Sequence, residues 1–217
     1  MSRNIRGFTI VELMLAMTVL SVLLLSIAML IIQIGHVYSR GVTLKSLNQT
    51  ATTLSRDIQT TLNQADSAMV QYVGLASKSG RLCTGDVTYA WNSVIDTTRQ
   101  DQARNFYTGN EHNQEIRFVR VTDKQNKLCE KNAQQNYPEL TYADTHELLP
   151  SGQYDFAMYE FYVGSRASSR SLHWVVMKLG STNSDDVDTV QEKCLVGQSG
   201  MGDFCAINIF EFTAGSR

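Results

Sequence analysis

The sequence predicts an α+β protein in which a long N-terminal helix packs on an antiparallel β-sheet head. Three observations predict this fold class. The chain has an apolar run from Phe8 to Ile34, then apolar residues spaced three and four apart from Leu44 to Met69, and it becomes rich in β-branched and aromatic residues beyond Gly74. The first two patterns are typical of helices, and the third is typical of strands.

The apolar run is long enough to cross a membrane. Its roughly 27 residues hold one charge, Glu12, and neither proline nor glycine, so a helix of this length spans ~40 Å against a bilayer core of ~30 Å. An ordinary secretory signal has an apolar core of about 7 to 15 residues followed by a small-residue cleavage site, which this run does not match. A plain uncleaved membrane anchor is the alternative. A carboxylate in hydrocarbon costs a few kcal/mol or more, so Glu12 needs a reason to be there.

The run begins with the sequence GFTIVEL at residues 7–13, after a short basic leader that contains Arg3 and Arg6. This motif resembles the start of the type IV pilin family, which includes minor pilins and the pseudopilins of type II secretion. The resemblance implies that a prepilin peptidase cuts after Gly7, that the new terminus at Phe8 is N-methylated, and that Glu12 is the assembly residue. The chain departs from many major pilins because it has no proline before Pro138. Gly35 and Gly41 are therefore the candidates for a flexible stretch in the helix.

The resemblance also implies the partners and the location. The positive-inside rule keeps the leader in the cytoplasm and places the rest of the chain across the cytoplasmic membrane as a single pass. Other pilin subunits, the prepilin peptidase/methylase and the pilus assembly platform are the expected partners. In a filament, the Phe8 amine of one subunit pairs with Glu12 of a neighbour, which fixes the axial register in a low-dielectric core. The end point is a cell-surface filament or a periplasmic pseudopilus.

The helix is expected to continue beyond the membrane as far as Tyr72. An apolar stripe at helical spacing predicts one face that seats the head: Leu44, Leu47, Ala51, Leu54, Ile58, Leu62, Ala65 and Met69. The expected organisation is a cleaved leader at 1–7, a transmembrane half-helix at 8–34, an amphipathic half-helix at 35–72 and a β-rich head with two disulfides at 73–217.

Within the head, composition predicts five strands and two irregular segments. The strands are expected at 87–91, 115–121, 154–163, 172–179 and 206–212. Residues 164–171 are rich in serine and arginine after a glycine, which predicts the loop of a hairpin. Residues 128–150 hold both prolines and little periodicity, which predicts a long surface excursion.

The four cysteines, Cys83, Cys129, Cys194 and Cys205, lie in the part expected outside the cytoplasm and allow three disulfide connectivities. We favour Cys83 with Cys129 and Cys194 with Cys205, because the second pair brackets a glycine-rich segment that can turn sharply. A zinc site is the alternative, but no C-x-x-C pair occurs and an exported compartment favours oxidation.

Little in the sequence points to catalysis. The formal net charge is -2, and removing Arg3 and Arg6 leaves 17 basic against 21 acidic residues, so a polycationic nucleic-acid binder is not indicated. The histidines are scattered without metal-ligand spacing. Residues 183–188 could bind calcium, but an exposed acidic turn is the simpler interpretation. The sequence predicts no enzyme, no cofactor and no metal ion.

Two function classes stay open. The first is a filament subunit of a pilus or pseudopilus, for which the long head with two disulfides favours a larger minor subunit. The second is a stand-alone membrane-anchored protein that uses its head for binding or adhesion. The first class needs Glu12, whereas the second should tolerate its loss.

Overall fold

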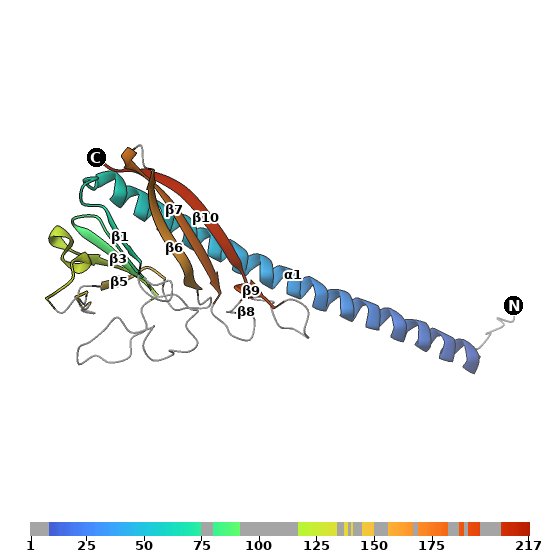
Figure 1. Cartoon of the computed structure of the whole chain (residues 1–217). Coiled ribbons are helices and arrows are strands. Elements are labelled where there is room, and N and C mark those ends of the chain that lie inside the picture. The colour runs from blue at the N-terminus through green and yellow to red at the C-terminus, as the bar shows by residue number, and fades with distance from the viewer. Residues whose placement is uncertain are drawn as a thin grey trace.

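The longest element of the computed structural model is the helix α1 (Ile10–Gln64), whose 55 residues span ~80 Å. Its N-terminal half extends away from the rest of the molecule, and its C-terminal half lies along the head (Figure 1). The structure describes residues 9–74, 80–91, 117–133, 137–138, 140, 145–149, 156–166, 169–181, 187–188, 191–195 and 205–217.

The described part of the head contains three antiparallel sheets. The first has the order β1-β2-β3-β4-β5, the second β10-β7-β6 and the third β8-β9. The strands are β1 (Gln71–Gly74), β2 (Gly80–Cys83), β3 (Val87–Trp91), β4 (Phe118–Thr122), β5 (Thr145–Glu147), β6 (Phe156–Arg166), β7 (Ser169–Ser181), β8 (Val187–Asp188), β9 (Lys193–Cys194) and β10 (Ile207–Gly215). Short 3-10 turns at Lys124–Cys129 follow β4. This arrangement is the α+β architecture that the sequence predicts.

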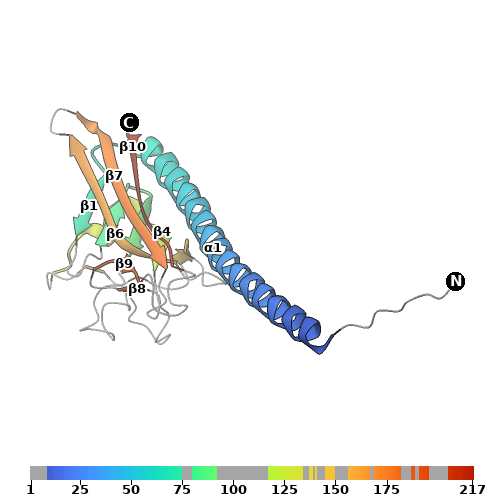
Figure 2. The same ribbon diagram turned by 90° about the vertical axis from the view of Figure 1, so that its right-hand side faces the viewer.

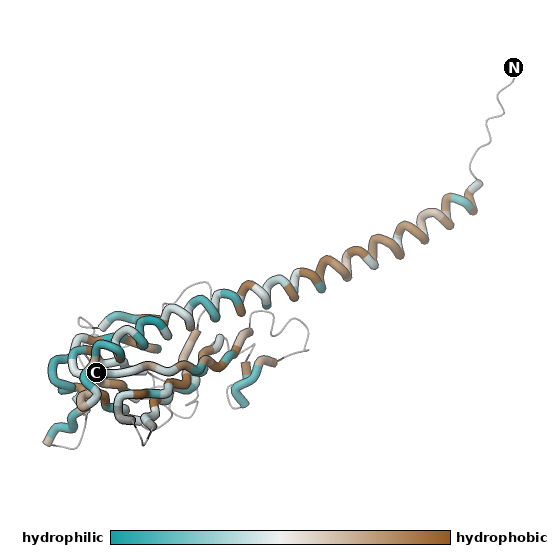
Figure 3. Tube along the Cα trace, turned by 90° about the horizontal axis from the view of Figure 1, so that it is seen from above, coloured by the Kyte–Doolittle hydropathy of each residue, from teal (hydrophilic) through white to brown (hydrophobic). Residues whose placement is uncertain are grey.

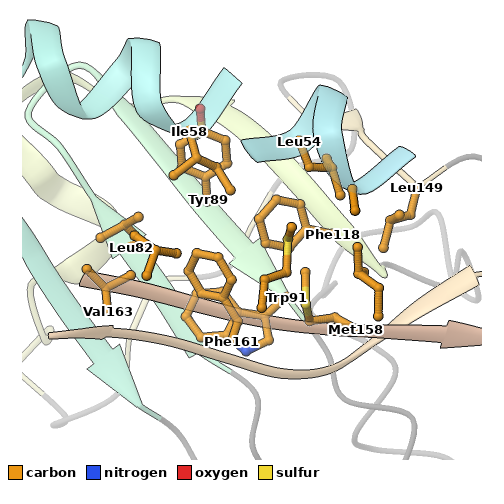
Figure 4. Packing of buried hydrophobic residues seen from close by; sticks show 14 of the residues in the cluster. Leu54, Ile58, Leu82, Tyr89, Trp91, Phe118, Leu149, Met158, Phe161 and Val163 are labelled. Carbon is orange, nitrogen blue, oxygen red and sulfur yellow. The ribbon is translucent and has the colours of Figure 1, made fainter. Parts of the chain in front are cut away.

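The main core lies where α1 meets the two larger sheets (Figure 4). Five of the eight residues in the predicted apolar stripe are buried on α1: Leu47, Ala51, Leu54, Ile58 and Leu62. They pack in one cluster with aromatic residues from both sheets, in which the Trp91 and Phe161 rings lie 4.7 Å apart. Burying large apolar side chains stabilises a fold by about 1.5–3 kcal/mol each, so this seat holds the helix firmly to the head.

The helix ends at Gln64, eight residues before the predicted end at Tyr72. Ala65 has an extended backbone, and the segment then turns because the Asp66 side chain accepts a hydrogen bond from the Ala68 N–H. The C-terminal tail holds this turn: the Ser67 N–H donates to the Arg217 carbonyl, and the Arg217 N–H donates to that of Ala65. A contact between the end of α1 and the C-terminal residue therefore overrides the local helical spacing. Leu44 and Met69, at the two ends of the predicted stripe, are exposed.

The structure differs from the predictions for the head mainly in the segments that connect the predicted strands. The predicted loop at 164–171 was too long, because β6 extends to Arg166 and β7 begins at Ser169. The segment 128–150 is not wholly a surface excursion, since β5 pairs with β4 and Leu149 is buried in the main core. The short strands β1 and β2 were not predicted. The first residues of the predicted strand 115–121 lie outside the described residues.

His173 on β7 should make the stability of the head depend on pH. Its side chain is buried, its Nε2 lies 3.0 Å from Ser216 Oγ, and burial lowers the pKa of the imidazole below its usual value of about 6.5. The imidazole of His173 therefore binds a proton more readily in the unfolded chain than in the folded one. The folding stability that the neutral imidazole contributes above pH ~6.5 is lost as the pH falls. Urea unfolding of the detergent-solubilised chain at pH 7 and pH 5 should show this loss. A His173→Gln variant should show a smaller one, and an unchanged pH dependence would contradict the assignment.

Candidate assembly site

The candidate site lies at the start of α1, where Thr9 and Glu12 form a capping box. Thr9 Oγ1 accepts a hydrogen bond from the Glu12 N–H at 3.3 Å, and Glu12 Oε2 accepts one from the Thr9 N–H at 3.1 Å. Thr9 Oγ1 also donates to the same carboxylate oxygen at 3.1 Å. These bonds satisfy backbone N–H groups that a helix start otherwise leaves without partners. Gly7 and Phe8 lie outside the described residues.

Glu12 keeps part of its carboxylate available. All three capping contacts involve Glu12 Oε2 or its backbone N–H, and Oε1 makes no hydrogen bond to any described residue. The side chain is exposed, and it lies next to the helix N-terminus, where the macrodipole favours negative charge. A cationic group from another molecule could therefore approach Oε1 while Oε2 continues to cap the helix.

The first half of the helix that carries Glu12 is not covered by the head. Every residue from Ile10 to Ile34 is exposed, and most of these residues are apolar, as the mainly brown colour of this half shows (Figure 3). Among the described residues, one helix, α1, has the length and the apolar composition needed to cross a membrane. An exposed apolar surface of this size calls for lipid or other protein around it.

The second half of α1 is tied to the head by polar contacts as well as by the core. The buried Tyr89 hydroxyl on β3 donates to Asp57 Oδ2 at 2.7 Å and lies 2.7 Å from Thr61 Oγ1. Arg120 on β4 lies 3.6 Å from Asp57 and completes a small network. Because each of these four side chains has a partner within it, the network fixes both the position and the rotation of α1.

Polar side chains of α1 also cover the edge strand β10. Gln59 Nε2 donates to the Thr213 carbonyl at 3.3 Å, and the Gly215 N–H donates to Asn63 Oδ1 at 3.2 Å. The direction of the apolar half is therefore set by its attachment to the head. Figure 2 shows α1 running along the head and out of it as one continuous rod.

The structure contains the two disulfides that the sequence analysis favours, Cys83–Cys129 and Cys194–Cys205, and no free cysteine. The cysteines are therefore not available as the zinc ligands of the alternative interpretation. Among the described residues, no group of three or more histidine, cysteine or acidic side chains could hold a metal ion. Most of the segment 183–188 lies outside the described residues, and Val187 and Asp188 form β8.

Comparison with known protein families identifies the start of the chain. Residues 2–32 match the model of the prokaryotic N-terminal methylation motif, which is the class III signal of type IV pilins. The motif and the long apolar helix together fit a type IV pilin-like subunit that is anchored in a membrane, and the motif implies processing by a prepilin peptidase and assembly with other pilins. No curated protein and no solved structure matches the chain significantly.

Sequence reasoning proposes Glu12 as the assembly residue and does not include Thr9 at the site. The signal was present, because a threonine followed three residues later by glutamate and then by an apolar run is the sequence pattern of a capping box. The sequence analysis gives Glu12 one expected role, as a partner for another subunit, and this role stays a prediction. The structure shows a different one, because Glu12 caps its own helix.

Proposed function

We propose that this chain is a minor subunit of a type IV pilus or of a secretion pseudopilus. The observation that carries the proposal is a methylation motif whose glutamate stands at the start of a bare apolar helix. The subunit resides in the cytoplasmic membrane with its leader in the cytoplasm and then enters a filament through its N-terminal helix. Its role there is structural, as a substrate of the peptidase and methylase and not as an enzyme.

The attachment of the head supports the same proposal. The core seat and the Tyr89–Asp57–Thr61 network hold α1 rigidly, while the residues of its apolar half, 10–34, are all exposed. Such a subunit can move from lipid into a bundle of like helices, because each environment covers the apolar sleeve. The minor status rests on the size of the head and on its two disulfides.

The first test is the N-terminus of the mature chain. Because Gly7 stands between the basic leader and Phe8, chain recovered from filaments of the native host should begin at Phe8 and carry one N-methyl group. Mass spectrometry of the N-terminal peptide measures both changes. A Gly7→Asp variant, compared with wild type in the same membranes, should keep its leader. An intact Met1 or Ser2 terminus in assembled wild-type material would refute the proposal.

A further inference from the structure

An exposed aromatic surface lies on the β10-β7-β6 sheet of the head, and Figure 1 shows this sheet at the end of the molecule opposite the N-terminus. Tyr162 on β6 and Leu172 and Trp174 on β7 are 44%, 40% and 48% exposed. Strand register places them on one face: Trp174 pairs with Gly164 of β6 on one side, and with Thr213 of β10 on the other. A contiguous patch of large exposed apolar residues indicates a binding site, whereas a single exposed residue does not.

The Tyr162 ring is held in a fixed position. Its phenol end lies over Gly164, where a Cβ atom would come within 2.9 Å of Tyr162 Cε1. Tyr72 of β1 meets it edge-on, with ring centroids 5.5 Å apart and planes at 68°. Trp174 meets it at 6.5 Å and 77°. Tyr162 therefore lies between two other rings and against a glycine, so little side-chain freedom remains to be lost when a ligand binds.

Tyr162 and Trp174 form two walls of a shallow cavity of about 420 Å³. Leu172, Gly164, Ser165 and Thr213 complete its described lining. None of these residues is charged, and three of them carry hydroxyl groups that can both donate and accept hydrogen bonds. The volume is within the range of small-molecule sites, and the mixture of rings and a few polar groups is typical of them.

The charged residues around the cavity limit the charge of the ligand that it can bind. Glu160 and Glu211 lie on the same face of the sheet, two residues before Tyr162 on β6 and two before Thr213 on β10. Both are exposed. Two exposed carboxylates beside a described lining without charged side chains disfavour anionic ligands, and Lys178 on the same face is ion-paired with Glu192.

We infer that this cavity binds a neutral sugar ring. A pyranose has a face of C–H groups, which packs on an aromatic ring, and a rim of hydroxyls, which exchange hydrogen bonds with Ser165, Thr213 and the Tyr162 hydroxyl. The absence of charged groups from the described lining matches a ligand without charge. The inference is independent of filament assembly, because the cavity belongs to the head alone.

The two tryptophans of the chain make the site directly measurable. Trp174 is about half exposed, whereas Trp91 is fully buried, so acrylamide quenching of the fluorescence of the full chain in detergent reports mainly on Trp174. Galactose, glucose and N-acetylglucosamine are the probes, and glucuronate is the anionic comparison. At least one neutral sugar should protect Trp174 from acrylamide with a saturable Kd of roughly 1–10 mM, as befits an open site. Glucuronate should protect less.

Matched variants separate the cavity from the rest of the sheet. Tyr162→Ala should weaken the protection about tenfold or more, because it removes one wall. Ile209→Ala, which changes an exposed apolar residue of β10 outside the lining, should leave it unchanged. A Trp174→Phe variant gives the background signal of Trp91. The inference is overturned if no neutral sugar protects Trp174, or if a sugar protects Trp174 equally well in the Tyr162→Ala variant. It is also overturned if the surface instead drives self-association of the chain that Tyr162→Ala abolishes.

Discussion

Changing Glu12 to alanine should leave the chain in the membrane but largely remove it from filaments. In the monomer, Glu12 lies at the start of α1 and caps its own helix. In the proposed membrane orientation, headgroups and water would solvate it there. In a filament, the same carboxylate would be surrounded by apolar helices and would need the Phe8 amine of a neighbour. Removing one partner of such a pair leaves an uncompensated buried charge, which typically costs 3–5 kcal/mol, or a loss of incorporation of a hundredfold or more.

Glu12→Gln distinguishes the two roles of this side chain. Glutamine can still accept a hydrogen bond from the Thr9 N–H, so it keeps the cap and loses only the charge. If pairing controls assembly, Glu12→Gln should be nearly as defective as Glu12→Ala. A Thr9→Val variant is the reverse control: it keeps the charge and the bond from the residue 9 N–H, loses the Thr9 Oγ1 half of the cap, and should cost only about 1 kcal/mol of helix stability.

The readout is the amount of epitope-tagged chain in sheared filaments relative to the membrane, with cleavage at Gly7 followed in the same samples. Cleavage and membrane levels should be equal for all four chains. Normal incorporation of Glu12→Ala would contradict the pairing and favour a stand-alone anchor. Normal incorporation of Glu12→Gln alone would show that the cap, and not the charge, is what assembly requires.

The parts of the fold that the sequence predicts are those set by short-range periodicity. Leu47, Leu54 and Ile58 repeat at helical spacing, and all three are buried against the head. Strand β3 has the predicted bounds because Val87–Trp91 combines β-branched and aromatic residues within five positions. The methylation motif could also be identified from the sequence, because its residues are contiguous.

The parts that could not be predicted depend on contacts between distant residues. The helix ends early because the backbone of Arg217 pairs with Ala65 and Ser67, a contact across most of the chain. β1 and β2 are four residues each and form by pairing with one another and with β3. The aromatic cavity needs the register of β6, β7 and β10, which the overlong predicted loop at 164–171 concealed.

Replacing both cysteines of the Cys83–Cys129 pair with alanine should destabilise the head by ~4 kcal/mol, more than the ~3 kcal/mol for Cys194–Cys205. The pairs are separated by 46 and 11 residues, and the stabilisation grows with the loop that a disulfide closes in the unfolded chain. Cys83 and Cys129 are also buried beside Asp123, which accepts hydrogen bonds from Thr88 Oγ1 and the Leu128 N–H. Losing the disulfide therefore also loosens the turns that pack against β2.

Urea unfolding of the full chain in detergent gives the two losses, and non-reducing peptide mapping of the wild type establishes the pairing. The Cys194→Ala/Cys205→Ala variant is the matched control for the number of cysteines removed. Membrane insertion should be unchanged in both, because insertion depends on the hydrophobicity of residues 10–34, which contain no cysteine. Free thiols on all four cysteines, or a peptide that links Cys83 to Cys194 or Cys205, would contradict the pairing. An equal loss in the two variants would show that strain or residual structure, and not loop length, sets the contribution of each disulfide.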